Sequence, residues 1–234
     1  MGAIFRREIN SFFTSSIAYI FLAVFFVCSG YFFYRGTLLS ATADMSSMFS
    51  SLFLVILILI PVLTMKTLSE EKKQKTDQGL LTAPISLWSI VLGKYFAALA
   101  LYTMGICIVF VYALILSYFG AVLWTTVFAN FFALFLLGAA FIAVGVFVSS
   151  LTENQMSSAV ASFLALMLLY MIDSIATLFK VEAIKELFIS LSFYSRFLEF
   201  TMGIFNLSSV VFYLSAAFLF NFFTVRVLEK RRWS

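Results

Sequence analysis

The sequence predicts an all-α integral membrane protein with six transmembrane helices. Three observations support this fold class: 63% of the 234 residues are hydrophobic, only 11% are charged, and the apolar residues stand in long blocks. A soluble chain usually has about a quarter charged residues, so this one could not cover its own surface with polar groups. Lipid must therefore form part of its solvent, and the alternating pattern of a transmembrane β-strand is missing.

Six apolar blocks have the length of a membrane span, and the whole chain, residues 1–234, is predicted to form a single domain. Eighteen helical residues rise about 27 Å, which is close to the hydrocarbon thickness of a bilayer. The third block is longer, so its helix is expected to tilt, to kink near Gly105 or to extend beyond the membrane. The predicted spans are residues 17–34, 49–65, 90–119, 122–148, 156–179 and 207–225.

The basic residues orient these spans. If the N-terminus lies inside, only four of the 15 lysines and arginines fall on the outer side, namely Arg35, Lys180, Lys185 and Arg196. The positive-inside rule therefore favours both termini on the cytoplasmic side. Because the basic residues stand at the ends of apolar blocks, the formal charge of +4 fits membrane anchoring better than binding of nucleic acid.

Residues 3–15, which precede the first span, predict a short amphipathic helix. Phe5, Ile9, Phe12 and Phe13 share one helical face, and the basic residues lie off that face. Such a helix can lie in the inner interface, as an elbow, before the chain enters the bilayer. The alternative is an ordinary frayed terminus.

Residues 180–206 form a long polar segment on the outer side. Apolar residues repeat there at helical spacing from Val181 to Leu191, and residues 193–200 are too aromatic to lie free in water. We expect one or two short helices on or in the outer leaflet, between the fifth and sixth spans. The alternative is a lid that packs only on the protein.

Groups that could perform catalysis are scarce. The sequence has no histidine, so no serine, cysteine or carboxylate can pair with a histidine base. The nucleotide-binding pattern G-x-x-x-x-G-K-[ST] does not occur. Cys28 and Cys107 lie inside apolar blocks, which fits small buried thiols better than a disulfide or a metal site. We therefore expect no enzyme activity, no metal site and no cofactor in this chain.

Asp173 is the one carboxylate inside an apolar block. Counted from Met156, it lies about 25 Å along the helix, near the outer interface. It either lines a translocation path or marks a helix end that reaches solvent. We favour the helix end, because a single ionisable residue is weak evidence for a translocation path.

Small residues gather in the fourth and fifth predicted spans. They include Gly138, Ala139, Ala140, Ala143 and Gly145 in the fourth, and Ser158, Ala159, Ala161, Ser162 and Ala165 in the fifth. In lipid such residues let helices approach closely, so we interpret them as packing surfaces rather than as the lining of a pore.

The loop between the fourth and fifth spans is the second cytoplasmic loop. Thr152 and Gln155 have the spacing of a capping box at the start of the fifth span, and Glu153 and Asn154 lie between them. The alternative is a plain turn.

The richest segment is the cytoplasmic one at residues 66–89. Charged residues come first, Leu80 and Leu81 follow, and Pro84 ends the run. A helix ending near Thr82 is expected because the residue before a proline disfavours the α region, and Ser86 is expected to cap the next helix. Exposed leucines rimmed by charge predict a docking surface for a partner, whereas the alternative is a solvated loop.

Several stretches together carry a family resemblance. They are residues 5–9, 70–86, 90–94, 149–155 and 227–231, and they resemble ABC exporter permeases of the type-2 family, most closely the gliding-motility and nitrous-oxide-accessory group. The residues that resemble the coupling segment of that family are Glu70, Glu71, Thr76, Leu80, Leu81 and Pro84. The segment departs from the family pattern at Lys75, where glycine is usual, and at Gln78 and Gly79.

The resemblance implies a half-transporter in the bacterial cytoplasmic membrane. Two permease chains, identical or related, would enclose a path between them. Two separate ABC ATP-binding subunits, which carry the ATP and Mg²⁺, would bind below. The coupling segment would sit in a groove of each ATP-binding subunit and carry its closing motion to the helices. An extracytoplasmic accessory protein is a further candidate partner.

Two other functions compete with this one. A carrier driven by an ion gradient usually places ionisable residues or broken helices at the midplane. Here the candidates are Asp173, which is off-centre, and Pro61, which lies near the end of a span. A non-transporting membrane scaffold of an ABC-like complex would bind the ATP-binding subunit but move no substrate.

Overall fold

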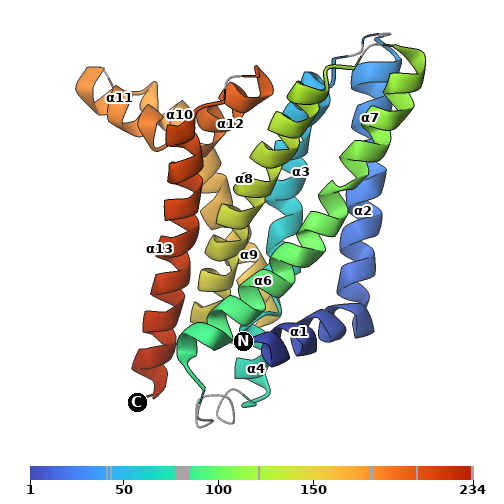
Figure 1. The fold of residues 1–234 in the computed structure, drawn as a ribbon. Helices are drawn as coiled ribbons and strands as arrows, with labels where there is room; N and C mark the ends of the chain where they lie inside the picture. The colour runs from blue at the N-terminus through green and yellow to red at the C-terminus, as the bar shows by residue number, and fades with distance from the viewer. Residues whose placement is uncertain are drawn as a thin grey trace.

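The structure is a computed structural model that describes residues 1–40, 42, 44–76, 85–120, 122–179, 182–203 and 205–232. The regular secondary structure of these residues is helical (Figure 1). In chain order the elements are α1 (Gly2–Thr14), α2 (Ser16–Phe33), the π-helical η1 (Tyr34–Leu38), α3 (Ser46–Thr64), α4 (Ser69–Lys73), α6 (Leu87–Ile106), α7 (Ile108–Phe119), α8 (Trp124–Leu151), α9 (Gln155–Tyr170), α10 (Ile172–Ala176), α11 (Glu182–Ser190), α12 (Phe193–Thr201) and α13 (Leu207–Arg232).

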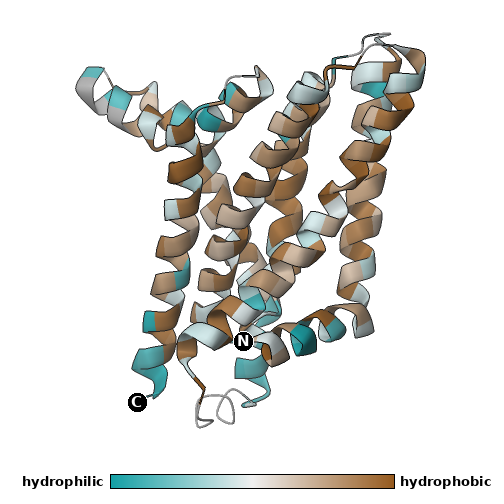
Figure 2. Ribbon diagram, viewed as in Figure 1, coloured by the Kyte–Doolittle hydropathy of each residue, from teal (hydrophilic) through white to brown (hydrophobic). Residues whose placement is uncertain are grey.

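Five helical runs in the described part of the chain are long and apolar enough to cross a membrane. They are Ser16–Leu38, Ser46–Lys73, Leu87–Phe119, Trp124–Leu151 and Leu207–Arg232. Figure 2 shows that these helices are apolar along most of their length and that hydrophilic residues collect at the two ends of the bundle. The five runs correspond to five of the six predicted spans, and the chain is therefore a multi-pass membrane protein.

The fifth predicted span, residues 156–179, is broken in the structure. α9 has 16 residues, and the helix ends at Tyr170 before the five-residue α10 begins at Ile172. Sixteen helical residues rise about 24 Å, which is less than the thickness of a typical hydrocarbon core. A sixth passage through the membrane therefore stays a prediction.

The third predicted span contains a break. α6 ends at Ile106 and α7 begins at Ile108, so the break lies two residues beyond Gly105. A kink near Gly105 was one of the three expectations for this long span. Gly105 packs against Phe21 of α2. Cys107, at the break, is exposed, which corrects the prediction that this thiol is buried. The helix turns its Cys107 side outward at this point, toward the surroundings of the bundle.

α8 lies at the centre of the bundle and contacts α3, α6, α9, α12 and α13. Its small residues allow close approach: a Cβ on Gly138 would overlap the ring of Tyr102, and a Cβ on Gly145 would overlap the side chain of Thr64. The Tyr102 hydroxyl also donates to the Leu134 carbonyl oxygen at 2.7 Å. The prediction that the small residues of this span form packing surfaces is confirmed.

Short elements cover the two ends of the bundle. α1, α4 and the end of α13 lie at the lower end in Figure 1, whereas η1 and α10–α12 lie at the upper end. Within the 180–206 segment, α12 packs on α8 and α3 and buries Phe197 and Phe200, as in the alternative of a lid packed on the protein. α11 extends away from the bundle.

Candidate functional site

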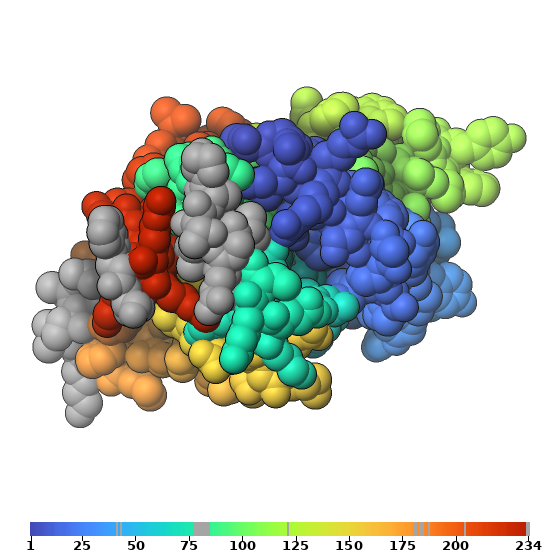
Figure 3. Space-filling model, turned by 90° about the horizontal axis from the view of Figure 1, so that it is seen from below, coloured from blue at the N-terminus to red at the C-terminus, as the bar shows by residue number. Residues whose placement is uncertain are grey.

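Three elements meet at the lower end of the bundle: α1, α4 and the first turns of α6. Figure 3, seen from below, shows α1 in blue beside residues 66–76 in cyan, and the start of α9 in yellow on their other side. α1 lies close along α6 because Gly93 leaves room for Ile4. A Cβ on Gly93 would lie only 2.9 Å from Cγ2 of Ile4.

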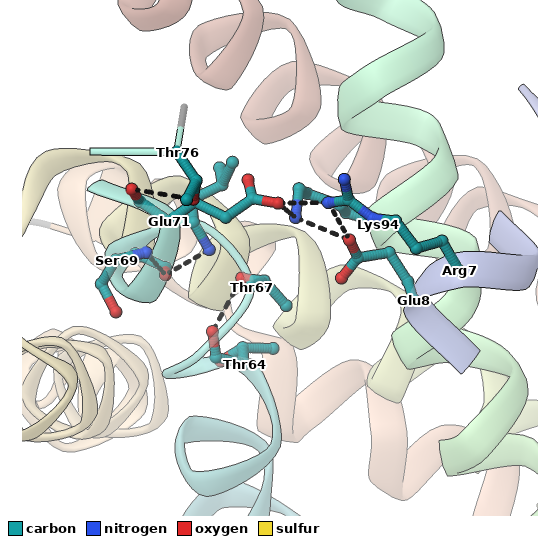
Figure 4. A network of polar contacts seen from close by, with 10 residues as sticks. Arg7, Glu8, Thr64, Thr67, Ser69, Glu71, Thr76 and Lys94 are labelled. Atoms are coloured by element: carbon teal, nitrogen blue, oxygen red, sulfur yellow. Dashed lines mark hydrogen bonds and ion pairs between the residues drawn. The ribbon is translucent and has the colours of Figure 1, made fainter. Parts of the chain in front are cut away.

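Arg7, Glu8, Glu71 and Lys94 form an ion-pair cluster where these three elements meet (Figure 4). Lys94 Nζ lies 2.9 Å from Glu8 Oε1 and 3.0 Å from Glu71 Oε1. Arg7 Nη2 lies 3.0 Å from Glu8 Oε1 and also pairs with Glu71 Oε1. Two carboxylates and two cations thus join α1, α4 and α6, which are far apart in the sequence.

The ion-pair cluster is electrically balanced and partly removed from solvent. Lys94 is only 1% exposed, and an unpaired ammonium there would carry a desolvation penalty of about several kcal/mol. Glu8 and Glu71 compensate that charge, and Arg7 compensates the second carboxylate. Burial lowers the pKa of the Arg7 guanidinium, but the hydrogen bonds and charges of Glu8 and Glu71 raise that pKa by more, so Arg7 stays cationic.

α4 is also tied to the end of α8 and to the loop between α8 and α9. Ser149 Oγ accepts hydrogen bonds from the backbone N–H groups of Leu68 at 3.2 Å and Ser69 at 3.1 Å. A hydroxyl that satisfies the free N–H groups at a helix start acts as a cap supplied by another helix. Lys72 Nζ lies 3.6 Å from Glu153 Oε1, so the predicted coupling segment and the second predicted loop touch directly.

An open cavity of about 550 Å³ lies between α1 and α4. Its walls include the whole ion-pair cluster, together with Lys66 and Glu70. The acidic and basic side chains of these walls balance, so the cavity favours neither an anion nor a cation. Its charged groups are paired with one another, so the cavity marks a junction at which α1, α4 and α6 are joined by ion pairs.

The predicted coupling residues that the structure describes lie around this junction. Glu71 belongs to the ion-pair cluster. Glu70 lies 3.8 Å from Lys66 Nζ and accepts a hydrogen bond from Gln74 Nε2 at 3.3 Å. The Thr76 hydroxyl donates to the Glu71 carbonyl oxygen at 3.4 Å. The remaining three predicted residues, Leu80, Leu81 and Pro84, lie outside the described residues.

The predicted helix of the coupling segment is shorter than expected at its described end. α4 stops at Lys73, and Lys75 has a φ of 56°, in the left-handed region that favours glycine. A single unbroken helix from the charged residues toward Thr82 is therefore excluded by the interruption at Lys75, whereas the predicted helix end near Thr82 lies outside the described residues. The cap predicted for the next helix is confirmed, because Ser86 Oγ accepts from the Ser89 N–H at 3.3 Å.

The predicted capping box of the second loop is also wrong. The N-cap of α9 is Asn154, whose Oδ1 accepts from the Met156 N–H at 3.2 Å. Thr152 instead donates its hydroxyl to the Val148 carbonyl oxygen at the end of α8, and Gln155 is the first residue of α9. An asparagine directly before the helix competes successfully with a threonine two residues earlier.

Asp173 lies at the opposite end of the molecule. It is in the first turn of α10, after the break at Met171, and its Oδ1 accepts from the Ser195 hydroxyl of α12 at 2.9 Å. Asp173 therefore ties α10 to α12 and is not brought together with the residues of the ion-pair cluster. Its proposed path-lining role stays a prediction.

Three members of the ion-pair cluster were missed as site residues. The sequence predictions used Arg7 and Lys94 to orient the chain, and otherwise used them and Glu8 only within the stretches that carry the family resemblance. A signal for Lys94 exists in the sequence, because an ionisable residue inside an apolar block is by default a candidate functional residue. Its partners could not be found that way, since Glu8 and Glu71 are distant in sequence and stand among other charged residues.

Within the described ranges, no group of three or more histidine, cysteine or acidic side chains could hold a metal ion.

A comparison with protein families gives a match over most of the chain. The profile of the family described as ABC-2 family transporter protein matches residues 3–225. No curated protein matches the chain.

Proposed function

Because the chain belongs to the ABC-2 transporter family, we propose that it is the permease subunit of an ATP-driven exporter. In this proposal two permease chains form the translocation path, and two ABC ATP-binding subunits supply ATP and Mg²⁺. The N- and C-termini face the cytoplasm of a bacterial cell, α1 acts as the interfacial elbow, and α9 with α10 makes a sixth passage. The likeness to the gliding-motility and nitrous-oxide-accessory group belongs to the same proposal.

The observation that carries the proposal is the ion-pair cluster. Residues 66–89 are the proposed contact with the ATP-binding subunit, and Glu71 in that segment is paired with Lys94 in α6 and with Arg7 in α1. A displacement of α4 would be passed to both helices, because separating a partly buried pair leaves uncompensated charge. α4 is also linked to the end of α8 through Ser149 and to the α8–α9 loop through Glu153.

Binding of the ATP-binding subunit and transmission of its motion can be tested separately. The chain is co-expressed with its ATP-binding subunit, the complex is purified, and ATP hydrolysis is measured in lipid nanodiscs. Leu80→Asp combined with Leu81→Asp is expected to abolish complex formation. Glu71→Gln is expected to leave the complex intact but to reduce the hydrolysis rate, because the cluster loses one of its two negative charges.

Glu186→Gln serves as the matched control, since Glu186 is an exposed glutamate in α11 at the other end of the molecule. Its hydrolysis rate should equal that of the unmodified chain. Complexes that form normally with both leucines replaced would contradict docking through this segment. Transport that continues without any ATP-binding subunit would indicate a carrier driven by an ion gradient.

A further inference from the structure

A second hollow of the molecule lies on the side of the bundle, between α1, α6 and α8. It is an open groove of about 710 Å³. Phe5 of α1 and Phe135 of α8 flank it, and α6 forms its floor from Phe96 to Cys107. In Figure 1 this part of α6 rises from the N-terminal end of α1 toward the middle of the bundle. The groove therefore begins at the level of α1 and continues along the membrane-spanning part of the molecule.

The lining of the groove is almost entirely apolar. The Thr103 hydroxyl, one of the few polar groups in its walls, donates to the Leu99 carbonyl oxygen at 2.7 Å within the same helix. Phe96 and Met104 remain 39% and 50% exposed, so side chains of the protein do not fill the groove. An apolar hollow that protein leaves open to a bilayer is best filled by hydrocarbon.

The length of the groove matches one leaflet. Phe96 and Cys107 are separated by eleven helical steps, which correspond to about 16 Å along α6. The hydrocarbon core of a typical bilayer is about 30 Å thick, so the groove is about half as long as that core. A single acyl chain of a phospholipid has this reach.

An exposed positive charge stands in α1 close to the residues that line the groove. Arg6 is exposed and has neither an ion pair nor a hydrogen bond with the residues that the structure describes. It stands one helical turn after Gly2, which lines the groove, and side chains of a helix lean toward its N-terminus. Arg6 does not itself line the groove, but its side chain leans toward the end of α1 that does, and a long basic side chain can reach a lipid headgroup from there.

We propose that the groove is a binding site for an anionic phospholipid, with one acyl chain along α6 and the headgroup at Arg6. The lipid belongs to the leaflet on the side of α1, which is the inner leaflet in the orientation proposed above. Anionic headgroups are attracted to basic residues at this surface. The bound chain holds Phe5 of α1 against α6, next to Glu8 and Lys94 of the ion-pair cluster.

The first test fills the groove. Ala100, a small and partly exposed residue of its floor, is replaced by tryptophan, and Val211→Trp on the exposed face of α13 is the control. The proteins are purified from membranes with phosphatidylglycerol and phosphatidylethanolamine, and retained lipid is measured by native mass spectrometry. The unmodified chain and Val211→Trp should retain a tightly bound phospholipid, and Ala100→Trp should lose it. Equal retention by all three proteins would overturn the proposal.

The second test addresses the headgroup. In nanodiscs with equal amounts of the two lipids, Arg6→Gln should abolish the preference of the bound lipid for phosphatidylglycerol. Arg232→Gln, which removes an exposed arginine at the end of α13, should keep that preference. An unchanged preference in Arg6→Gln would contradict the assignment of the headgroup to this residue.

A third measurement uses the unmodified groove, so it does not depend on how Ala100→Trp folds. A phospholipid with a photoreactive group on its acyl chain should label residues 96–107 in preference to the equally exposed residues of α13. Even labelling of both helices would overturn the proposal. In the Cys28→Ala variant, an efficient Cys107–Cys107 disulfide between two chains would also overturn it, because a second copy would then cover the groove.

Discussion

Because Lys94 is buried and paired with two carboxylates, the stability of the protein should depend strongly on it. Lys94→Met would leave Glu8 and Glu71 close together with only Arg7 to compensate them. Breaking a buried pair in this way costs about 3–5 kcal/mol, so the unfolding midpoint in detergent should fall strongly.

An exposed pair provides the control for this prediction. Arg226 Nη1 lies 2.6 Å from Glu229 Oε2 in α13, and losing such a pair costs at most about 1 kcal/mol. Arg226→Gln should therefore change the midpoint far less than Lys94→Met. Replacing Glu8 and Glu71 by glutamine together with Lys94→Met should restore part of the lost stability. Similar unfolding midpoints for Lys94→Met and Arg226→Gln would contradict the prediction that the buried ion pairs contribute more stability than the exposed pair.

Lys75 occupies a backbone conformation that suits glycine. Its φ of 56° costs a non-glycine residue about 1–3 kcal/mol, so Lys75→Gly should be tolerated or slightly stabilising despite the greater chain entropy of glycine. Lys75→Val should be destabilising, because a β-branched side chain fits this region poorly. Unfolding in detergent measures both. Lys73→Val, at the last helical position of α4, is the control and should show a much smaller loss.

At the scale of elements, the packing of α8 on α6 depends on Gly138. Gly138→Ala would push a methyl group into the ring of Tyr102, and overpacking of this kind typically costs about 1–3 kcal/mol. Gly120→Ala is the matched control, since a Cβ there meets no atom within 4 Å. Combining Gly138→Ala with Tyr102→Leu should recover part of the loss. An unfolding midpoint unchanged by Gly138→Ala would contradict this close contact.

The elements differ in how much of them could be predicted from sequence. The long apolar helices follow directly from hydropathy, because lipid requires every buried backbone group to be satisfied within a helix. The ends of the helices were harder to predict from the sequence. Asn154 rather than Thr152 caps α9, and Lys75 interrupts the helix predicted in the coupling segment. Both errors arise because several polar residues compete locally, and backbone geometry decides between them.

The candidate site was only half predictable. Glu71 was found through a likeness of its segment to a family, whereas Glu8 and Lys94 became site residues only when α1 was seen to lie along α6. Contacts between residues that are more than eighty positions apart depend on how the helices pack, and the hydropathy of the sequence does not predict that packing.

At the scale of the whole molecule, the decisive prediction is whether the chain crosses the membrane through α9. With Cys28 and Cys107 replaced by alanine, Glu153→Cys before α9 and Glu186→Cys after it place single thiols at exposed positions. If α9 and α10 span the bilayer, an impermeant maleimide should label Glu186→Cys in intact cells and Glu153→Cys only after permeabilisation. Labelling of both positions from the same side would contradict a sixth passage.

The pairing of Lys94 with Glu8 and Glu71 also bears on how the protein is made. The ribosome completes both glutamates before it reaches Lys94, so the negative partners are present when α6 enters the membrane. A lysine opposes insertion of an apolar helix, by about 2.5–3.5 kcal/mol at the helix centre and by less toward the end, where Lys94 lies. Removal of α1 is therefore expected to lower the efficiency with which α6 inserts during synthesis, which a glycosylation-site insertion assay would measure.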